Sequence, residues 1–192
     1  MSFESTLTHP LDAFQKQGIE SMKNNHSIMV AAPTGSGKTI FAEYARHLSR
    51  EAGTKMIFCA PLKAISNQKY QDFKKKFGEE NIGIITGDVV VNENADLLIM
   101  TTEILRALVF ARDGRLNDVK WVVFDEIHYL NDPSRGSVYE ETLILIPNTM
   151  RAVFLSATVP NSNEFATWFG NLKNHQVDVF SRRAYDSIRK MP

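Results

Sequence analysis

Short apolar runs recur along the chain, and most of them are separated by stretches with helical periodicity. The runs lie at residues 27–31, 55–60, 82–85, 97–100, 121–124, 152–155 and 177–180. Runs with little polar alternation are typical of strands buried on both faces, and strands that alternate with helices need parallel crossover connections. The pattern therefore predicts an α/β fold in which helices flank a mainly parallel sheet.

The helical stretches carry apolar residues at the spacing of one helix face. Residues 11–24 are predicted to form a short helix with four such residues, Leu11, Phe14, Ile19 and Met22. A second helix is predicted after Pro61, with three aromatic residues on one face, Tyr70, Phe73 and Phe77. Polar clusters follow directly after several apolar runs, and parallel sheets bind ligands beyond the carboxyl ends of their strands. We therefore expect the functional residues to gather at that edge.

Composition describes an ordinary globular domain, with 192 residues, 43% hydrophobic and 23% charged. Lys plus Arg equals Asp plus Glu at 22 each, so no bulk positive charge indicates a nucleic-acid partner. Any such partner must be held by local contacts. The single cysteine, Cys59, excludes an intrachain disulfide and disfavours a structural zinc site, which fits a reducing compartment.

Residues 1–180 are predicted to form one domain, followed by a divergent basic tail at 181–192. The tail carries four basic side chains and one acidic one, without a clear strand or helix period. The N-terminus is polar and no apolar stretch approaches the length of a membrane span, so neither secretion nor membrane insertion is expected. We expect an intracellular protein, with nucleus and cytoplasm both open.

A glycine-rich loop follows the first apolar run and precedes an amphipathic stretch. Its residues are Ala32, Pro33, Thr34, Gly35, Ser36, Gly37, Lys38 and Thr39. A triphosphate site needs this order of strand, turn and helix, because the glycines let backbone N–H groups approach phosphate oxygens at the positive end of a helix. Lys38 is expected to reach the β and γ phosphates of ATP, and Thr39 to offer a hydroxyl to Mg²⁺. The strict pattern begins with glycine instead of Ala32, and a chance glycine-rich turn before a helix is the alternative.

Two carboxylates follow the apolar run 121–124, in the sequence Asp125-Glu126-Ile127-His128. In a P-loop NTPase an aspartate at this place holds Mg²⁺, here Asp125 together with Thr39. Glu126 is placed to orient the attacking water or to accept its proton. Two acidic residues can also simply stabilise a helix N-terminus. The phosphate loop upstream in an α/β chain favours the catalytic interpretation.

The order of these motifs, followed by Ser156-Ala157-Thr158, resembles superfamily 2 helicases of the D-E-x-H type. Longer strings resemble the superkiller-type DExH-box RNA helicases, the group that feeds RNA to the exosome. These strings are the motif Ia region at 60–70, the motif Ib region at 84–88 and 98–106, and agreements at 135–136, 140–141 and 155–161. The resemblance implies an N-terminal RecA-like domain and covers roughly residues 11–180. The loop departs from the group at Gly35-Ser36, where Ser-Ala is usual.

The resemblance implies further roles around the ATP site. Gln15 resembles the adenine-reading glutamine, and His128 would help couple hydrolysis to the partner domain. Ser156 and Thr158 resemble the motif that links the ATP site to RNA. The alternatives are an exposed polar position for Gln15, a structural histidine for His128, and helix capping for Ser156 and Thr158.

The resemblance also implies a path for RNA along the motif Ia and Ib regions. Its residues are Pro61, Lys63, Gly87, Thr101, Thr102 and Arg106. A point charge, hydroxyls, backbone N–H groups and a helix N-terminus contact phosphodiesters without reading bases. Such contacts would let a chain with no net charge bind RNA of any sequence.

A helicase needs a second RecA-like domain with the arginines that complete the ATP site, and we expect that domain outside this chain. The isolated chain should bind ATP and Mg²⁺ weakly, hydrolyse slowly at best and unwind nothing, because an arginine finger is worth about 10³ to 10⁵ in rate. Expected partners are RNA, the second domain and exosome-associated proteins. Two alternatives stay open: a DExH helicase of splicing or DNA repair, and a truncated, non-enzymatic module that binds nucleotide or RNA.

Overall fold

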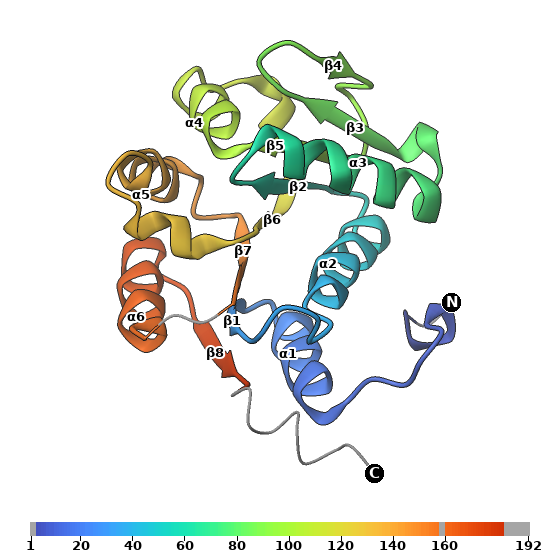
Figure 1. The fold of residues 1–192 in the computed structure, drawn as a ribbon, viewed down its shortest axis with the longest axis vertical. Coiled ribbons are helices and arrows are strands. Elements are labelled where there is room, and N and C mark those ends of the chain that lie inside the picture. Colours follow the sequence, from blue (N-terminus) through green and yellow to red (C-terminus); the bar gives the residue numbers. More distant parts are fainter. Residues whose placement is uncertain (1–2, 158–159, 183–192) are drawn as a thin grey trace.

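Eight strands form one sheet in the order β4-β3-β5-β2-β6-β7-β1-β8 in the computed structural model, which describes residues 3–157 and 160–182 (Figure 1). The strands are β1 Ser27–Ala31, β2 Lys55–Ala60, β3 Ile82–Ile85, β4 Val90–Val91, β5 Leu97–Thr101, β6 Val119–Phe124, β7 Arg151–Ser156 and β8 Val177–Ser181. All neighbouring strands pair in parallel except β3 and β4, which are antiparallel. The predicted α/β fold with a mainly parallel sheet is therefore confirmed.

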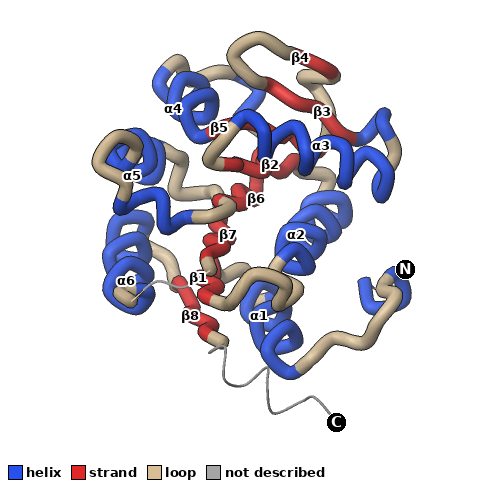
Figure 2. The backbone as a smooth tube through the Cα atoms, in the orientation of Figure 1, coloured by secondary structure: helices blue, strands red, loops and turns tan. Residues whose placement is uncertain are grey.

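Helices cover both faces of this sheet, which runs between them in Figure 2. The α-helices are α1 Ala13–Lys23, α2 Thr39–Glu51, α3 Lys63–Phe77, α4 Thr102–Phe110, α5 Gly136–Leu145 and α6 Ser162–Lys173. Short 3-10 helices are η1 Phe3–Thr6, η2 Glu79–Asn81, η3 Gly114–Leu116 and η4 Ile127–Asn131. One core cluster joins α1, α2 and α3 to the sheet, and a second joins α4, α5 and α6 to its other face.

The apolar runs are continuous because successive side chains enter different cores. In β1, Ile28 and Val30 belong to the core under α1 and α2, whereas Met29 belongs to the core on the opposite face. All five residues of β1 are buried. A strand with two buried faces has no place for the polar alternation of a half-exposed strand.

Helices α1 and α2 pack closely at Gly18. A methyl group added there would lie 2.4 Å from Cε1 of Phe41, which is fully buried. Only glycine fits this contact without displacing the ring. The close approach holds α1, which carries Gln15 near its start, against α2, which begins at the end of the glycine-rich loop.

Two elements differ from the sequence-based expectation. The strand β4 was not expected, because it is two residues long and both of its valines are exposed. Strand β8 continues to Ser181, and Arg182 beyond it is held by the domain, so the chain remains part of the sheet slightly past residue 180. Among the described residues, no helix has the length and apolar character needed to cross a membrane.

Candidate functional site

The glycine-rich loop connects β1 to α2, as the sequence predicts. Gly35 and Gly37 have φ angles of +80° and +78°, a conformation that favours glycine. A methyl group at Gly37 would also lie 2.6 Å from Nε2 of Gln15. The amide of Ala32 donates to the carbonyl oxygen of Ser156 at 3.0 Å, which ties the start of the loop to the end of β7.

Lys38 lies across the loop that it ends. Its Nζ donates to the carbonyl oxygens of Ala32 at 2.5 Å and Pro33 at 3.0 Å. Burial lowers the pKa of Lys38, and the charges of Glu126 and Asp125 act in the opposite direction. The ammonium group therefore lies within the electrostatic reach of both candidate catalytic carboxylates.

Asp125 follows the carboxyl end of β6. Its amide donates to the carbonyl oxygen of Cys59 at 2.8 Å, and its Oδ1 accepts the Glu126 amide at 3.1 Å. Burial raises the pKa of Asp125, the Glu126 charge raises it further, and Lys69 and Lys38 oppose the shift. A cation beside this carboxylate would lower its pKa and so offset the free-energy cost of burying its charge.

The backbone of Glu126 is left-handed, with φ of 52° and ψ of 48°. A non-glycine residue in this region is strained, and such residues concentrate at functional sites. The turn ends β6 abruptly and starts η4 at Ile127. It sets Glu126 and His128 at the same edge of the sheet as the phosphate loop.

His128 lies between the catalytic candidate Glu126 and strand β7. Its Nδ1 is 3.2 Å from Oε2 of Glu126 and 3.4 Å from Oγ of Ser156. The contact with Glu126 lacks hydrogen-bond geometry, so it is an ion pair only when the imidazole is protonated. Thr158, the other residue expected in the coupling motif, lies outside the described residues.

Gln15 lies at the third position of α1 and faces the phosphate loop. Its side-chain Oε1 accepts a hydrogen bond from the backbone amide of Asp12 at 3.1 Å. The backbone amide of Gln15 donates to Oδ1 of Asp12 at 2.9 Å. This is a capping box, in which two free donors of the helix start are satisfied reciprocally. Its Nε2 donates to the carbonyl oxygen of Gly37 at 3.4 Å.

The expected RNA residues lie at or after the carboxyl ends of β2, β3 and β5, at the starts of α3 and α4, and, for Arg106, in the middle of α4. Lys63 forms an ion pair with Asp88, and Arg106 pairs with Glu141 at 3.0 Å. Gly87 is exposed in the loop between β3 and β4, and Thr101 is the N-cap of α4.

Two of the expected RNA residues are buried. Thr102 is only 1% exposed, so its hydroxyl does not reach the surface. Pro61 is also buried, and its carbonyl oxygen accepts a hydrogen bond from Nη1 of Arg135. Arg135 also lies 3.9 Å from Glu103, and sequence reasoning gave it no role. Its occurrence in a string that resembles the helicase group was the available signal.

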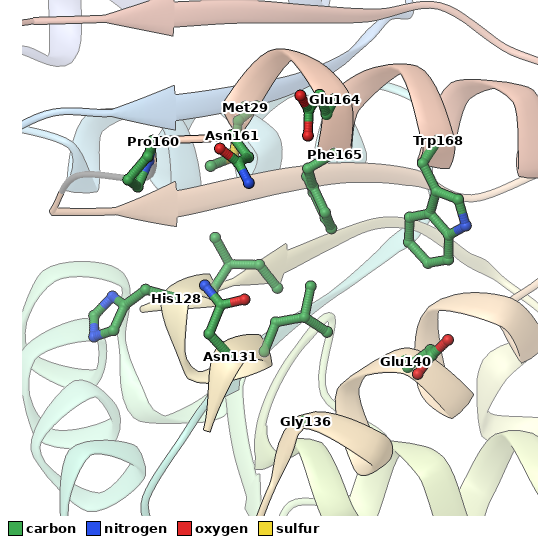
Figure 3. A pocket seen from close by; sticks show the side chains of 12 residues that line it. Met29, His128, Asn131, Gly136, Glu140, Pro160, Asn161, Glu164, Phe165 and Trp168 are labelled. Carbon is green, nitrogen blue, oxygen red and sulfur yellow. The ribbon is translucent and has the colours of Figure 1, made fainter. Parts of the chain in front are cut away.

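A cavity of about 640 Å³ lies beside this edge, between η4, α5 and α6 (Figure 3). Asn131 and Asn161 extend into it from opposite sides, and Glu140 and Glu164 are among its lining residues. It contains His128 but no residue of the phosphate loop, and its lining has neither lysine nor arginine. Two carboxylates, with neither lysine nor arginine beside them, disfavour binding of a triphosphate in this cavity. The cavity is therefore distinct from the candidate nucleotide site.

Comparison with known proteins assigns the chain to a family. Residues 12–165 match the family described as DEAD/DEAH box helicase. The chain belongs to this helicase family. The Asp-Glu-Ile-His sequence at the turn after β6 is its variant of the family box.

Curated relatives narrow the group. The chain is 48% identical over 171 residues to "Antiviral helicase SKI2" of Saccharomyces cerevisiae, covering 89% of this chain and 13% of that protein. It is 48% identical over 182 residues to "Exosome RNA helicase MTR4" of Homo sapiens, covering 95% of this chain and 17% of that protein. The resemblance to superkiller-type helicases is thus confirmed. The chain spans less than a fifth of the length of either relative.

Solved structures share the fold at low sequence identity. The Mycobacterium smegmatis helicase Lhr, bound to ssDNA and AMP-PNP, aligns with a TM-score of 0.74 and 22% identity over 94% of this chain and 27% of that one. The Pyrococcus furiosus Hef helicase domain aligns with a TM-score of 0.66 and 21% identity over 93% of this chain and 40% of that one. These matches support the RecA-like helicase fold alone.

Proposed function

We propose that this chain is the ATP-binding lobe of a DExH-box RNA helicase that uses ATP hydrolysis to move along RNA and unwind it. The observation that supports this best is the placement of Lys38 at the start of α2 and of Asp125 and Glu126 directly after β6, because the carboxyl ends of parallel strands share one edge of the sheet. The relatives named SKI2 and MTR4 support a role in exosome-linked RNA processing or decay. We propose an intracellular location, in the nucleus or the cytoplasm.

Phosphate binding would begin in the loop between β1 and α2. Backbone N–H groups from Thr34 to Thr39 would face the phosphate oxygens at the positive end of α2. Lys38 would exchange its bonds to the Ala32 and Pro33 carbonyl oxygens for oxygens of the β and γ phosphates. Its present bonds keep the ammonium group over the loop, so the exchange needs a short movement.

The residues present fit a magnesium ion that is shared with the nucleotide. The described part of the chain holds no group of three His, Cys, Asp or Glu side chains that could bind a metal alone. Mg²⁺ typically takes one or two carboxylates and completes its shell with water and substrate phosphates. Asp125 and Thr39 would hold it, and when bound it supplies neutralisation of charge on the β and γ phosphates.

Glu126 would act on the attacking water. Its side chain is 31% exposed, so water reaches it, and its left-handed backbone fixes its direction. Glu126 would take a proton from the water while the water oxygen bonds to the γ phosphorus and the bond to the bridging oxygen breaks. ADP leaves with the electron pair of that bond. The arginines of a second RecA-like domain would complete charge stabilisation in the transition state.

RNA would compete for side chains that are now in exposed ion pairs. Lys63 and Arg106 would exchange the carboxylates of Asp88 and Glu141 for phosphodiester groups. Exposed ion pairs contribute only about 0–1 kcal/mol, so this exchange is inexpensive. The helix start at Thr101 would add backbone N–H groups, and none of these contacts reads a base.

Stimulation of the ATPase rate by RNA compared with DNA distinguishes an RNA helicase from a DNA-directed helicase. ATPase rates of the protein that carries this lobe are measured with single-stranded RNA and DNA of matched length. Stronger stimulation by RNA is expected, and equal or stronger stimulation by DNA contradicts the proposal. Robust RNA-stimulated hydrolysis by the 192-residue chain alone would contradict the need for the second domain.

A further inference from the structure

Arg182 is held by the domain at two points directly after β8. Its backbone amide donates to the carbonyl oxygen of Ala31 at 2.9 Å, the residue before the phosphate loop. Its Nη1 donates to Oδ2 of Asp12 at 2.8 Å, and the two side chains are 18% and 27% exposed. A partly buried, charge-assisted bond of this length constrains both partners more than an exposed ion pair does.

Asp12 uses its other carboxylate oxygen to cap α1. Its Oδ1 accepts a hydrogen bond from the backbone amide of Gln15, and the backbone amide of Asp12 donates to the side-chain Oε1 of Gln15. Because the oxygen end of the Gln15 side chain is held in this way, its Nε2 points to Gly37. A continuous set of hydrogen bonds therefore runs from Arg182 through Asp12 and Gln15 to the phosphate loop.

We propose that Arg182 is a positioning residue for Gln15. By fixing the carboxylate of Asp12, Arg182 fixes the capping box and with it the direction in which the Gln15 amide meets the base of the nucleotide. Arg182, directly after β8, is thereby coupled to base recognition, and the coupling is reciprocal in binding free energy. The inference rests on the proposed ATP function and on the base-reading role of Gln15.

The test separates base recognition from phosphate binding. Dissociation constants for ATP and for inorganic tripolyphosphate, both with Mg²⁺, are measured on the 192-residue chain. Tripolyphosphate contacts the loop but has neither base nor sugar, so the ratio of the two constants reports recognition of the nucleoside, and the part lost in Gln15→Ala is the contribution of Gln15. A purely structural role for Arg182 would change thermal stability or both constants without changing this ratio.

Arg182→Ala is expected to weaken ATP binding about fivefold to tenfold, the scale of one typical hydrogen bond, and to leave tripolyphosphate binding unchanged. Gln15→Ala should remove the same preference, and Arg182→Lys should restore part of it. Asp12→Asn is a second route, because asparagine still caps the helix but loses the charge that Arg182 pairs with. Arg115→Ala, which removes ion pairs to Asp113 and Glu93 elsewhere, is the matched control and should keep the ratio.

The outcomes are distinguishable. A wild-type ratio in both Arg182→Ala and Asp12→Asn overturns the positioning role while the ATP proposal stands. A wild-type chain that binds ATP no better than tripolyphosphate overturns base reading by Gln15 and the positioning role with it. A chain that binds neither ligand contradicts the proposed function itself.

Discussion

The Nδ1 atom of His128 lies 3.2 Å from Oε2 of Glu126, a residue whose backbone is left-handed. The same nitrogen is 3.4 Å from Oγ of Ser156, whose carbonyl oxygen accepts the amide of Ala32. The candidate general base, the end of β7 and the start of the phosphate loop are therefore joined through one imidazole. We propose that this arrangement transmits a change at β7 to Glu126, the candidate general base.

Glu126→Gln should separate binding from hydrolysis. The amide keeps the size of the side chain but cannot take a proton, so turnover of the complete enzyme should fall by about 10² to 10⁴. The dissociation constant of ATP should change little. Steady-state ATPase assays and nucleotide titrations measure the two effects, with Glu20→Gln as a control on an exposed carboxylate of α1. Unchanged turnover in Glu126→Gln would remove Glu126 from its proposed role.

Stability should depend on the protonation of His175. Burial, helped by the charge of Arg151, lowers the pKa of this imidazole to about 4. Its Nδ1 lies 3.2 Å from Nη1 of Arg151 and its Nε2 lies 2.9 Å from Oγ of Ser27, which suits the neutral ring. The unfolded chain, with a pKa near 6.5, binds more protons between pH 4 and 6.5, so stability is lost as the pH falls through this window.

The predicted loss is about 1–3 kcal/mol of unfolding free energy between pH 6.5 and 4. Urea denaturation at several pH values measures it, and His175→Gln should have a flatter profile because glutamine does not titrate. Parallel pH profiles for the two proteins would show that His175 is not the titrating group.

Arg46 should be replaceable without loss of stability. The residue is 5% exposed, and its guanidinium lies 4.2 Å from the centre of the Phe77 ring. Its Nε and Nη2 have no hydrogen-bond partner in the described part of the chain. Replacing a buried charge by an apolar group of similar volume is often neutral or stabilising. Arg46→Met should therefore be neutral or raise the unfolding free energy by about 1 kcal/mol.

Denaturant titration of Arg46→Met and of Arg50→Met tests this expectation. Arg50 is exposed on the same helix, so its replacement controls for a general change of charge on α2. A loss of more than about 2 kcal/mol in Arg46→Met alone would indicate that the guanidinium is well paired, since breaking a buried pair costs that much or more.

The sheet was predictable because its strands are buried on both faces and therefore appear as continuous apolar runs. Strand β4 was not, because the exposed Val90 and Val91 give no such signal. The phosphate loop and the carboxylates were found because their chemistry needs short motifs of fixed order. The left-handed turn at Glu126 has no comparable signal, since glycine is the usual residue there.

Contacts between distant positions were also beyond the sequence. Arg182 and Asp12 are 170 positions apart, and only the parallel pairing of β8 with β1 brings them together. The burial of Thr102 likewise depends on packing and not on its position in a motif. Sequence alone therefore did not show which side chains of the candidate site reach the surface.

Equilibrium binding of ATP with Mg²⁺ to the 192-residue chain and to its Lys38→Ala variant tests the central claim most directly. The wild-type chain should bind saturably, and loss of the charged hydrogen bonds to the phosphates should weaken binding by about tenfold to a hundredfold. Lys75→Ala, on the exposed surface of α3, should bind like the wild type. Equal affinities of the wild-type and Lys38→Ala proteins would contradict a nucleotide site built on this loop.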